Sequence, residues 1–254
     1  MDKIDGCLDG PGKTTTATVI SPCLNAQPGV DCSQCRVRSL SVCGALEDPE
    51  LAALDKLSRH LFFKPKDTIF DQDERASVVY NITAGAVRLS KLLPDGRRQV
   101  VGFALPGDFL GLSMADQTAF CADALTPVSV CQFQRSQFSD FLDEKPHLLR
   151  RLHQLAGHEL SLAQDQMVIL GRRTAEERVA SFLVGLRKRW ARINGNSPTI
   201  PLPMTRQDIG DFLGLTVETV SRMMTRLARE KAIVVVPDGV RLLDIPRMEA
   251  LAEV

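Results

Sequence analysis

The chain shows several kinds of apolar patterning, and they predict different types of structure. Residues 45–61 carry leucines at spacings of three, three and four, which predicts a helix with one apolar face: Leu51, Leu54, Leu57 and Leu61. From about residue 62 to residue 141, short apolar and polar stretches alternate, and turn glycines recur every eleven residues at positions 85, 96 and 107. This spacing predicts a compact antiparallel barrel or sandwich.

A second predicted helix, over residues 146–170, carries two apolar stripes on neighbouring faces. The first stripe comprises Leu148, Leu152, Leu155 and Leu162, and the second comprises Leu160, Ala163, Met167 and Leu170. Two apolar faces need two partners. The pattern leaves two interpretations open: both faces are buried within one subunit, or one face meets the same helix of a second subunit. Glu159 and Gln166 interrupt the leucines, which suits a marginal interface.

Residues 204–230 predict two helices separated by a tight break. Thr205 with Asp208 three residues later is an N-cap pattern. Gly214 suits the left-handed turn that ends a helix, and Thr216 caps the next one. Inward positions of that second helix lie at spacings of three, four and three: Val217, Val220, Met224 and Leu227. This is the helix-turn-helix arrangement, whose second helix enters the major groove of DNA.

The outer face of the second helix carries polar residues at offsets of zero, three, four and seven: Glu218, Ser221, Arg222 and Thr225. Arginine can bond guanine O6 and N7 together, glutamate can accept from cytosine N4, and serine can contact a base or a phosphate. The capping residues Thr205 and Thr216 are further candidates for DNA contact.

Composition changes this picture only slightly. The 254 residues include 31 basic and 31 acidic side chains, and 44% apolar content can fill cores without disulfides. From Arg172 onward there are 14 Lys plus Arg against 10 Asp plus Glu, which is a mild electrostatic indication of a nucleic-acid partner. No base or nucleophile constellation is evident among the histidines, so we expect no enzyme: His60, His147, His153 and His158.

The chain has no sign of membrane insertion or export. No apolar run approaches the roughly 20 residues that cross a bilayer. The first thirty residues lack the charged and apolar regions of a signal peptide. We therefore expect a cytoplasmic protein without a membrane partner. Residues 1–30 are rich in Gly, Pro and Thr, which predicts a mobile tail.

The spacing of three cysteines indicates a metal centre. Cys32, Cys35 and Cys43 stand as C-x2-C-x7-C, and in a reducing compartment such a cluster is more often metal-binding or catalytic than a disulfide framework. A [4Fe–4S] cluster needs four thiolates, and spacing alone does not choose between Cys121 and Cys131 for the fourth. We expect Cys121 to be a small buried apolar residue rather than a ligand. Cys7 and Cys23 lie in the predicted tail and receive no role.

Three stretches make the sequence similar to a known family: "LTVETVSR", "AEERVASFL" and "LPGDFLGL". From about residue 30 to its end, the chain closely resembles the CRP/FNR family of bacterial transcription regulators. The resemblance implies an α+β protein with an N-terminal β-roll of the cyclic-nucleotide-binding type (a double-stranded jelly roll), a long dimerisation helix and a C-terminal winged helix-turn-helix. The expected divisions are a tail (1–30), a cysteine-bearing segment with a helix (31–61) and the β-roll (62–145). The dimerisation helix (146–171) and the DNA-binding domain (172–254) follow.

The resemblance also implies partners and roles. The family reads palindromic double-stranded DNA as a homodimer, with base reading by the residues that correspond here to Glu218, Ser221 and Arg222. RNA polymerase is the further partner expected of such a regulator. The strands of the wing would lie within residues 232–245.

Effectors differ within this family, and the sequence narrows the choice. Residues 99–134 contain no Lys, Arg or His, although the cyclic-nucleotide-binding members carry an Arg-Ser pair and a Glu there. A buried phosphate without a cation is costly, so we expect no cyclic nucleotide. "VSVCQF" resembles the segment that holds the fourth cluster ligand in the FNR branch, which implies Cys131 as that ligand. The cysteine spacing resembles the FnrN-like, FixK-related oxygen regulators.

These inferences lead to one expectation with several alternatives. We expect an oxygen-responsive regulator, mainly an activator of anaerobic or microaerobic genes, that dimerises and binds DNA while a [4Fe–4S] cluster is intact on Cys32, Cys35, Cys43 and Cys131. The same sulfurs could instead hold structural zinc, or they could be redox-active or simply buried thiols. A regulator of the same family without a cluster and a thiol oxidoreductase using Cys32 and Cys35 are the remaining alternatives.

Overall fold

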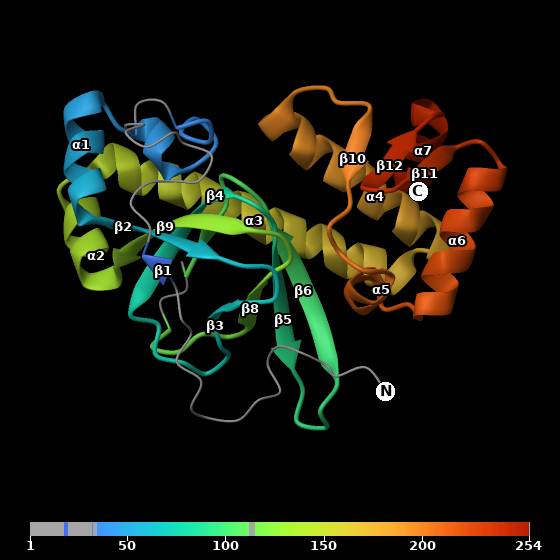
Figure 1. Cartoon of the computed structure of the whole chain (residues 1–254), viewed down its shortest axis with the longest axis horizontal. Helices are drawn as coiled ribbons and strands as arrows, with labels where there is room; N and C mark the ends of the chain where they lie inside the picture. The colour runs from blue at the N-terminus through green and yellow to red at the C-terminus, as the bar shows by residue number, and fades with distance from the viewer. Residues whose placement is uncertain (1–17, 20–31, 33–34, 112–114, 254) are drawn as a thin grey trace. The chain divides into compact units, whose positions relative to one another are not determined.

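The computed structural model describes residues 18–19, 32, 35–111 and 115–253 (Figure 1). The chain divides into two compact units, and the division along the sequence falls between Gly157 and His158. Most of the predicted tail lies outside the described residues. Its described part, Thr18–Val19, forms strand β1, which pairs with Leu61 and Phe62.

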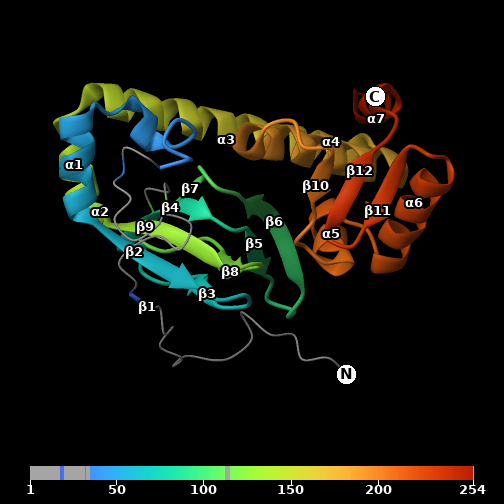
Figure 2. The same ribbon diagram turned by 45° about the horizontal axis from the view of Figure 1, so that its top comes forward.

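The first unit contains two antiparallel sheets. Their strand orders are β1-β2-β9-β4-β7 and β3-β8-β5-β6 (Figure 2). The strands are β2 (Ser58–Phe63), β3 (Thr68–Phe70), β4 (Val78–Ala84), β5 (Val87–Leu92), β6 (Arg98–Ala104), β7 (Phe109–Leu110), β8 (Cys121–Ala124) and β9 (Val128–Gln134). Both sheets contribute buried side chains to one core, including Ile82 and Val130 from the first and Val87 and Ala122 from the second. The predicted β-roll is confirmed.

Alternation along β9 separates two apolar regions of this unit. Val128 and Val130 face the core between the sheets. Cys131 and Phe133 belong instead to a second core, on the face of the sheet that is covered by helices. Because successive side chains of a strand point to opposite faces, the odd-numbered positions of β9 are directed to the helical side.

The three predicted turn glycines all adopt positive φ, at 87° for Gly85, 82° for Gly96 and 99° for Gly107. At Gly85 space is limiting as well, because a Cβ atom would lie 2.3 Å from the carbonyl oxygen of Pro127. The turn predicted at Gly96 has the sequence "PDG", residues 94–96, and connects β5 to β6.

Helices cover the second core of this unit. They are the 3-10 helix η2 (Val42–Ala45), α1 (Asp48–Leu57), α2 (Arg135–Asp143) and the first part of α3 (Pro146–Arg172). The helix predicted over residues 45–61 is therefore too long. Leu51 and Leu54 are buried by α1, but Leu61 lies in β2, where it alternates with Phe63 rather than following a helical period.

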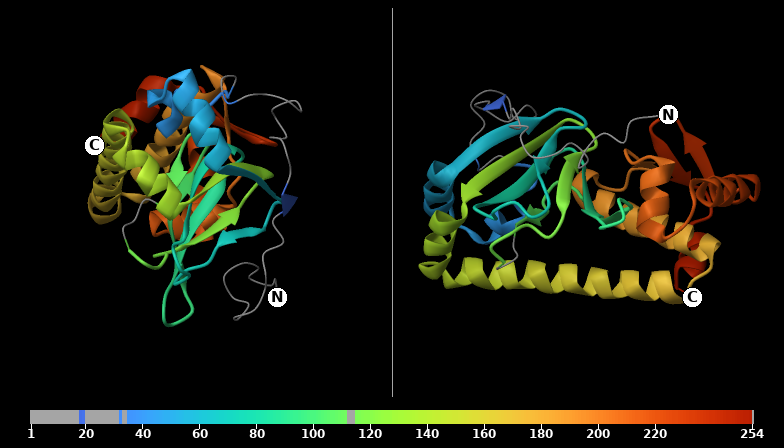
Figure 3. Two further views of the ribbon diagram at one scale, coloured as in Figure 1. Left: turned by 90° about the vertical axis from the view of Figure 1, so that its left-hand side faces the viewer. Right: turned by 90° about the horizontal axis from the view of Figure 1, so that it is seen from below.

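The long helix α3 is unbroken from Pro146 to Arg172 (Figure 3). Its apolar residues differ in how deeply they are buried. Leu148 is fully buried in the helix-covered core, and Leu152 and Leu155 pack against that core. Assigning Leu148 to a dimer interface is therefore wrong, because the subunit's own core already buries it.

The second unit is built on α4 (Ala175–Asn194), which buries Val179 and Leu183. The other elements are β10 (Thr199–Pro201), α5 (Arg206–Leu213), α6 (Val217–Arg229), β11 (Ile233–Val236), β12 (Gly239–Leu242) and α7 (Ile245–Glu253). Strands β11 and β12 are the predicted wing. The sheet also includes β10, within a stretch whose polar residues predict only a linker, in the order β10-β12-β11. Among the described residues, no helix combines the length and apolarity needed to span a bilayer.

Candidate DNA-binding surface and cysteine cluster

The two helices of the predicted helix-turn-helix have the caps that the sequence indicates. The Thr205 hydroxyl accepts from the Asp208 amide at 3.1 Å, and the Asp208 carboxylate accepts from the Thr205 amide at 2.9 Å. Gly214 ends α5 in the left-handed conformation, with φ 63° and ψ 40°. The Thr216 hydroxyl then accepts from the Thr219 amide at 3.2 Å and starts α6. The capping geometry is confirmed.

The outer face of α6 is exposed as predicted at Glu218, Ser221, Arg222 and Thr225. Arg222 lies along the helix, where its Nη2 donates to the Thr219 hydroxyl at 3.1 Å. The pKa of Glu218 is lowered, chiefly by a backbone hydrogen bond, then by Thr216 and Arg222. At neutral pH this face therefore offers a carboxylate acceptor beside a guanidinium donor, the combination that can read a G·C pair. The DNA contacts of these residues, and of Thr205 and Thr216, stay predictions.

Arg178 positions the helix-turn-helix within the second unit. Its guanidinium donates to three main-chain carbonyl oxygens: Leu170 in α3 at 2.8 Å, Arg173 at 2.9 Å and Leu213 in α5 at 3.0 Å. One half-buried cation thus satisfies carbonyl groups at the ends of two helices, where they otherwise lack partners. Sequence patterning does not identify this role, because the acceptors are main-chain atoms, and one of them lies 35 residues from Arg178.

Arg226 fixes the far end of α6. It lies 3.2 Å from a carboxylate oxygen of Glu176 in α4 and 3.0 Å from one of Glu230. Its charge is therefore partly neutralised inside the unit. Arg222, nearer the start of α6, is the better placed of the two arginines for contact with a base.

Replacing Gly214 with alanine should cost about 1 kcal/mol, because an L residue with a side chain resists the left-handed conformation. The added Cβ would meet only ordinary contacts, 3.5 Å from Arg178 and 3.6 Å from Leu170, so conformation rather than collision sets the cost. Unfolding followed by Trp190 fluorescence measures it. Gly185→Ala in α4, where the Cβ would enter open space, is the control and should be stabilising.

The segment that carries the predicted cysteine ligands is docked through its main chain. Arg151 of α3 donates to the carbonyl oxygens of Ser39, Leu40 and Ser41 at 3.2, 3.2 and 3.3 Å. Arg38 donates to Leu46 and pairs with Asp48. The segment is thereby attached to α3 and to the start of α1.

The four predicted cluster cysteines lie in one region and outside disulfides. Cys131, which is 9% exposed, belongs to the helix-covered core, and Cys32 and Cys43 pack against that core. Cys35 lies near enough to Cys32 and Cys43 for its negative charge to help raise the pKa values of both thiols. Cys121 lies instead in the other sheet, where it is fully buried, as expected of a small apolar residue. Cys7 and Cys23 lie outside the described residues.

For two of the four thiols, Cys32 and Cys43, the surroundings favour the protonated form. Burial raises the pKa of the Cys32 thiol far above its ordinary value, and a hydrogen bond to Asp55 raises it further. Burial also raises the pKa of Cys43. A reactive redox cysteine has the opposite property, a lowered pKa in an electropositive site.

The cysteine thiols are the right type of ligand for an iron–sulfur cluster, and they lie in a suitable, partly buried region. Three thiols, those of Cys32, Cys43 and Cys131, border a single apolar region, and Cys35 is three residues from Cys32 in the sequence. Thiolates are the ligands that such clusters use. The four cysteines do not form a closed coordination shell: the described residues contain no group of three or more Cys, His, Asp or Glu side chains already arranged to hold a metal ion. Metal binding at this site therefore requires the sulfurs to approach one another.

The outward-facing apolar residues of α3 lie mainly in its second half. Leu160, Leu162 and Met167 are 60, 37 and 70% exposed, and Ala163 is exposed as well. Leu149 and Val168, at 50 and 56%, are exposed apolar residues outside both predicted stripes. Leu170 is half-buried.

One polar interruption of the α3 stripes has a partner within the chain. Gln166 donates to the carbonyl oxygen of Phe212 at 3.0 Å. Its amide is therefore engaged inside the second unit, and its place in a dimer interface stays a prediction.

Comparisons with known proteins agree with this architecture. Residues 60–145 match the cyclic nucleotide-binding domain family, and residues 177–253 match the Crp-like helix-turn-helix domain family. The chain is 54% identical to the transcriptional activatory protein AadR of Rhodopseudomonas palustris, over 87% of this chain and 92% of AadR. It is 51% identical to the nitrogen fixation regulation protein FixK of Bradyrhizobium diazoefficiens, over 87 and 93% of the two chains.

A solved structure shows the same fold. FixK2 from Bradyrhizobium japonicum superposes with a TM-score of 0.72 at 36% identity, covering 78% of this chain and 98% of FixK2. Relatives of this similarity, together with the helix-turn-helix geometry, establish a DNA-binding regulator. The chain belongs to the CRP/FNR family of transcription regulators.

Proposed function

We propose that this regulator is an oxygen-responsive activator that pairs with a second copy of itself and binds palindromic DNA while Cys32, Cys35, Cys43 and Cys131 hold a [4Fe–4S] cluster. RNA polymerase is the further partner proposed for an activator. The observation that carries the proposal is that Cys32 and Cys43 pack against the same helix-covered core as Cys131, which is about ninety residues away in the sequence. Bound there, the cluster would supply an iron–sulfur core that oxygen can dismantle.

The attachment of the cysteine segment to α3 supports a link between the sulfurs and dimerisation. Arg151 joins the carbonyl oxygens of residues 39–41 directly to α3. A rearrangement of the segment therefore acts on the same helix that exposes Leu160 and Met167. Burying such side chains against a second α3 would favour the dimer, which places two recognition helices about 34 Å apart, one turn of DNA.

We propose in addition that the β-roll binds no cyclic nucleotide. The guanidinium of Arg88 donates to Asp123 at 2.7 Å, and both side chains are almost fully buried. Arg88 is thus already paired, and residues 99–134 contain no Lys, Arg or His that could neutralise a phosphate.

A thiol oxidoreductase is the weaker alternative, because the raised pKa values of Cys32 and Cys43 oppose thiolate chemistry. Zinc on the same sulfurs remains an outcome that metal analysis distinguishes.

The test is anaerobic purification of the full chain. Wild type should be brown and carry about four irons and four sulfides per chain, and air should remove both the colour and the specific DNA binding. Cys131→Ser should lose the cluster while keeping the fold. Zinc in place of iron, or an operator affinity that is unchanged when all four cysteines are serine, would contradict the proposal.

A further inference from the structure

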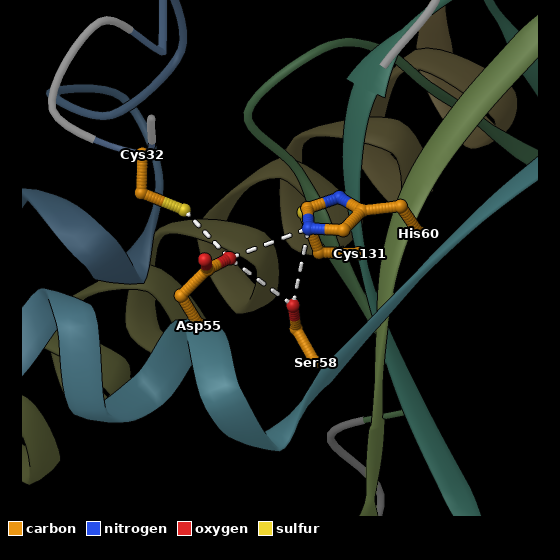
Figure 4. Close-up of polar contacts among 5 residues, drawn as sticks. All are labelled: Cys32, Asp55, Ser58, His60 and Cys131. Carbon is orange, nitrogen blue, oxygen red and sulfur yellow. Dashed lines mark hydrogen bonds and ion pairs between the residues drawn. The ribbon is translucent and has the colours of Figure 1, made fainter. Parts of the chain in front are cut away.

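A chain of polar contacts connects two of the four sulfurs (Figure 4). Cys32 Sγ donates to Asp55 Oδ1 at 3.0 Å, and the same oxygen lies 3.3 Å from His60 Nε2. On the other side of the ring, His60 Nδ1 lies 3.6 Å from Cys131 Sγ. Ser58 Oγ lies 3.4 Å from the Asp55 oxygen and 3.3 Å from His60 Nε2, so its hydroxyl contacts both middle residues of this series.

The two middle residues are fixed by rigid elements. His60 stands opposite Cys131 in the pairing of β2 with β9, and it alternates with the core residues Leu61 and Phe63, so it faces the helical side. Asp55 lies in the last turn of α1. Only Cys32 comes from outside these elements, so the contact with Asp55 attaches the cysteine segment to the α1–β2 corner.

The position of Asp55 in α1 is unfavourable for the helix itself. A carboxylate in the last turn opposes the helix dipole, and aspartate is a poorer helix former than alanine. The stability of α1 therefore does not explain this residue, whereas its contacts with Cys32 and His60 do.

We propose that Asp55 and His60 are positioning residues that hold Cys32 beside Cys131 in the metal-free protein, gathering two of the four ligands before iron binds. The description of these thiols as ligands rests on the proposed function. The contacts of Asp55 and His60 with the two cysteines are present in the metal-free protein. With its hydrogen on Nε2, His60 donates to Asp55 and accepts from the Cys131 thiol.

The first test is Asp55→Ala in the metal-free full chain, followed by hydrogen–deuterium exchange. Amides of the cysteine segment are hydrogen-bonded to carbonyl groups of the same segment, as at Arg38, Leu40, Ser41 and Gly44, so their exchange reports its order. Their exchange should accelerate roughly tenfold, the effect of one lost hydrogen bond, while α1 and β9 keep their protection. Asp140→Ala, the same change in the last turn of α2 at an exposed site, is the matched control and should leave the segment unchanged.

A double-mutant cycle separates positioning from general loosening. Asp55 should be coupled to Cys131 through His60, so the effects of Asp55→Ala and Cys131→Ala on segment exchange should be non-additive. In a His60→Phe background the two effects should become additive. Additivity with His60 intact, or equal acceleration in Asp140→Ala, would overturn the proposal.

Iron loading distinguishes this proposal from the proposed function. If wild type assembles a cluster and Asp55→Ala assembles it equally fast with unchanged exchange, the positioning role fails and oxygen sensing stands. If wild type takes up no iron but Asp55→Ala still loosens the segment, the contacts hold the segment and the sensing proposal fails.

Discussion

Asp123→Ala should lower the free energy of unfolding of the β-roll by about 3–5 kcal/mol, because it strands a buried cation. The Asp123 carboxylate accepts from Arg88 at 2.7 Å and from the Thr68 hydroxyl at 3.0 Å. The side chains of Arg88 and Asp123 are only 12 and 4% exposed, so water cannot replace the lost partner. Unfolding of the full chain in urea, followed by the β-sheet signal in circular dichroism, measures the change.

The matched control removes both charges. Arg88→Met with Asp123→Leu leaves no buried charge and should recover most of the stability. Asp140→Ala, at an exposed site, should change stability by less than about 0.5 kcal/mol. If the single and double variants are equally destabilised, the cost comes from packing rather than from the unpaired guanidinium.

Arg222→Ala should weaken binding to the preferred half-site by about 1–3 kcal/mol, roughly 5- to 150-fold, because it removes a forked contact with guanine. The half-site can be defined by selection of random DNA with the wild-type chain. Fluorescence anisotropy then compares the selected site with one in which the contacted guanine is replaced. Arg222→Ala should lose the difference between the two sites while keeping weak binding to both.

The control for this prediction is Arg229→Ala, an exposed arginine at the end of the same helix. It should weaken binding to all sequences alike, if it affects binding at all. An equal loss for Arg222→Ala on every sequence would mean that Arg222 contacts only phosphate.

The parts of the fold that depend on local chemistry were predictable from the sequence. Caps at Thr205 and Thr216 and the left-handed Gly214 act within one helical turn, so their residue types carry the information. The turn glycines of the β-roll are predictable for the same reason.

Features that depend on contacts between distant segments were not predictable. Leu61 continues the helical spacing of α1 but lies in β2, because strand pairing outweighs the local pattern. Leu148 and Leu160 both look like interface leucines, yet only the fold shows that the first is buried and the second exposed. The roles of Arg151 and Arg178 depend on main-chain oxygens, which leave no trace in residue type.

The candidate cysteine site also combines features that were predictable from the sequence with features that were not. The C-x2-C-x7-C spacing indicates a metal centre, and the alternation of β9 explains why Cys131 faces the cysteine segment. Asp55 and His60 could not be found in this way, because a lone aspartate at a helix end and a lone histidine in a strand are unremarkable in sequence.

The hydrogen bonds from Arg151 to residues 39–41 fix the main chain of this loop and involve none of its side chains. A guanidinium that binds peptide oxygens does not discriminate among side chains, so the exposed Ser39 can be exchanged without releasing the loop. Substitutions of the exposed side chains in this loop should therefore leave its attachment to α3 intact.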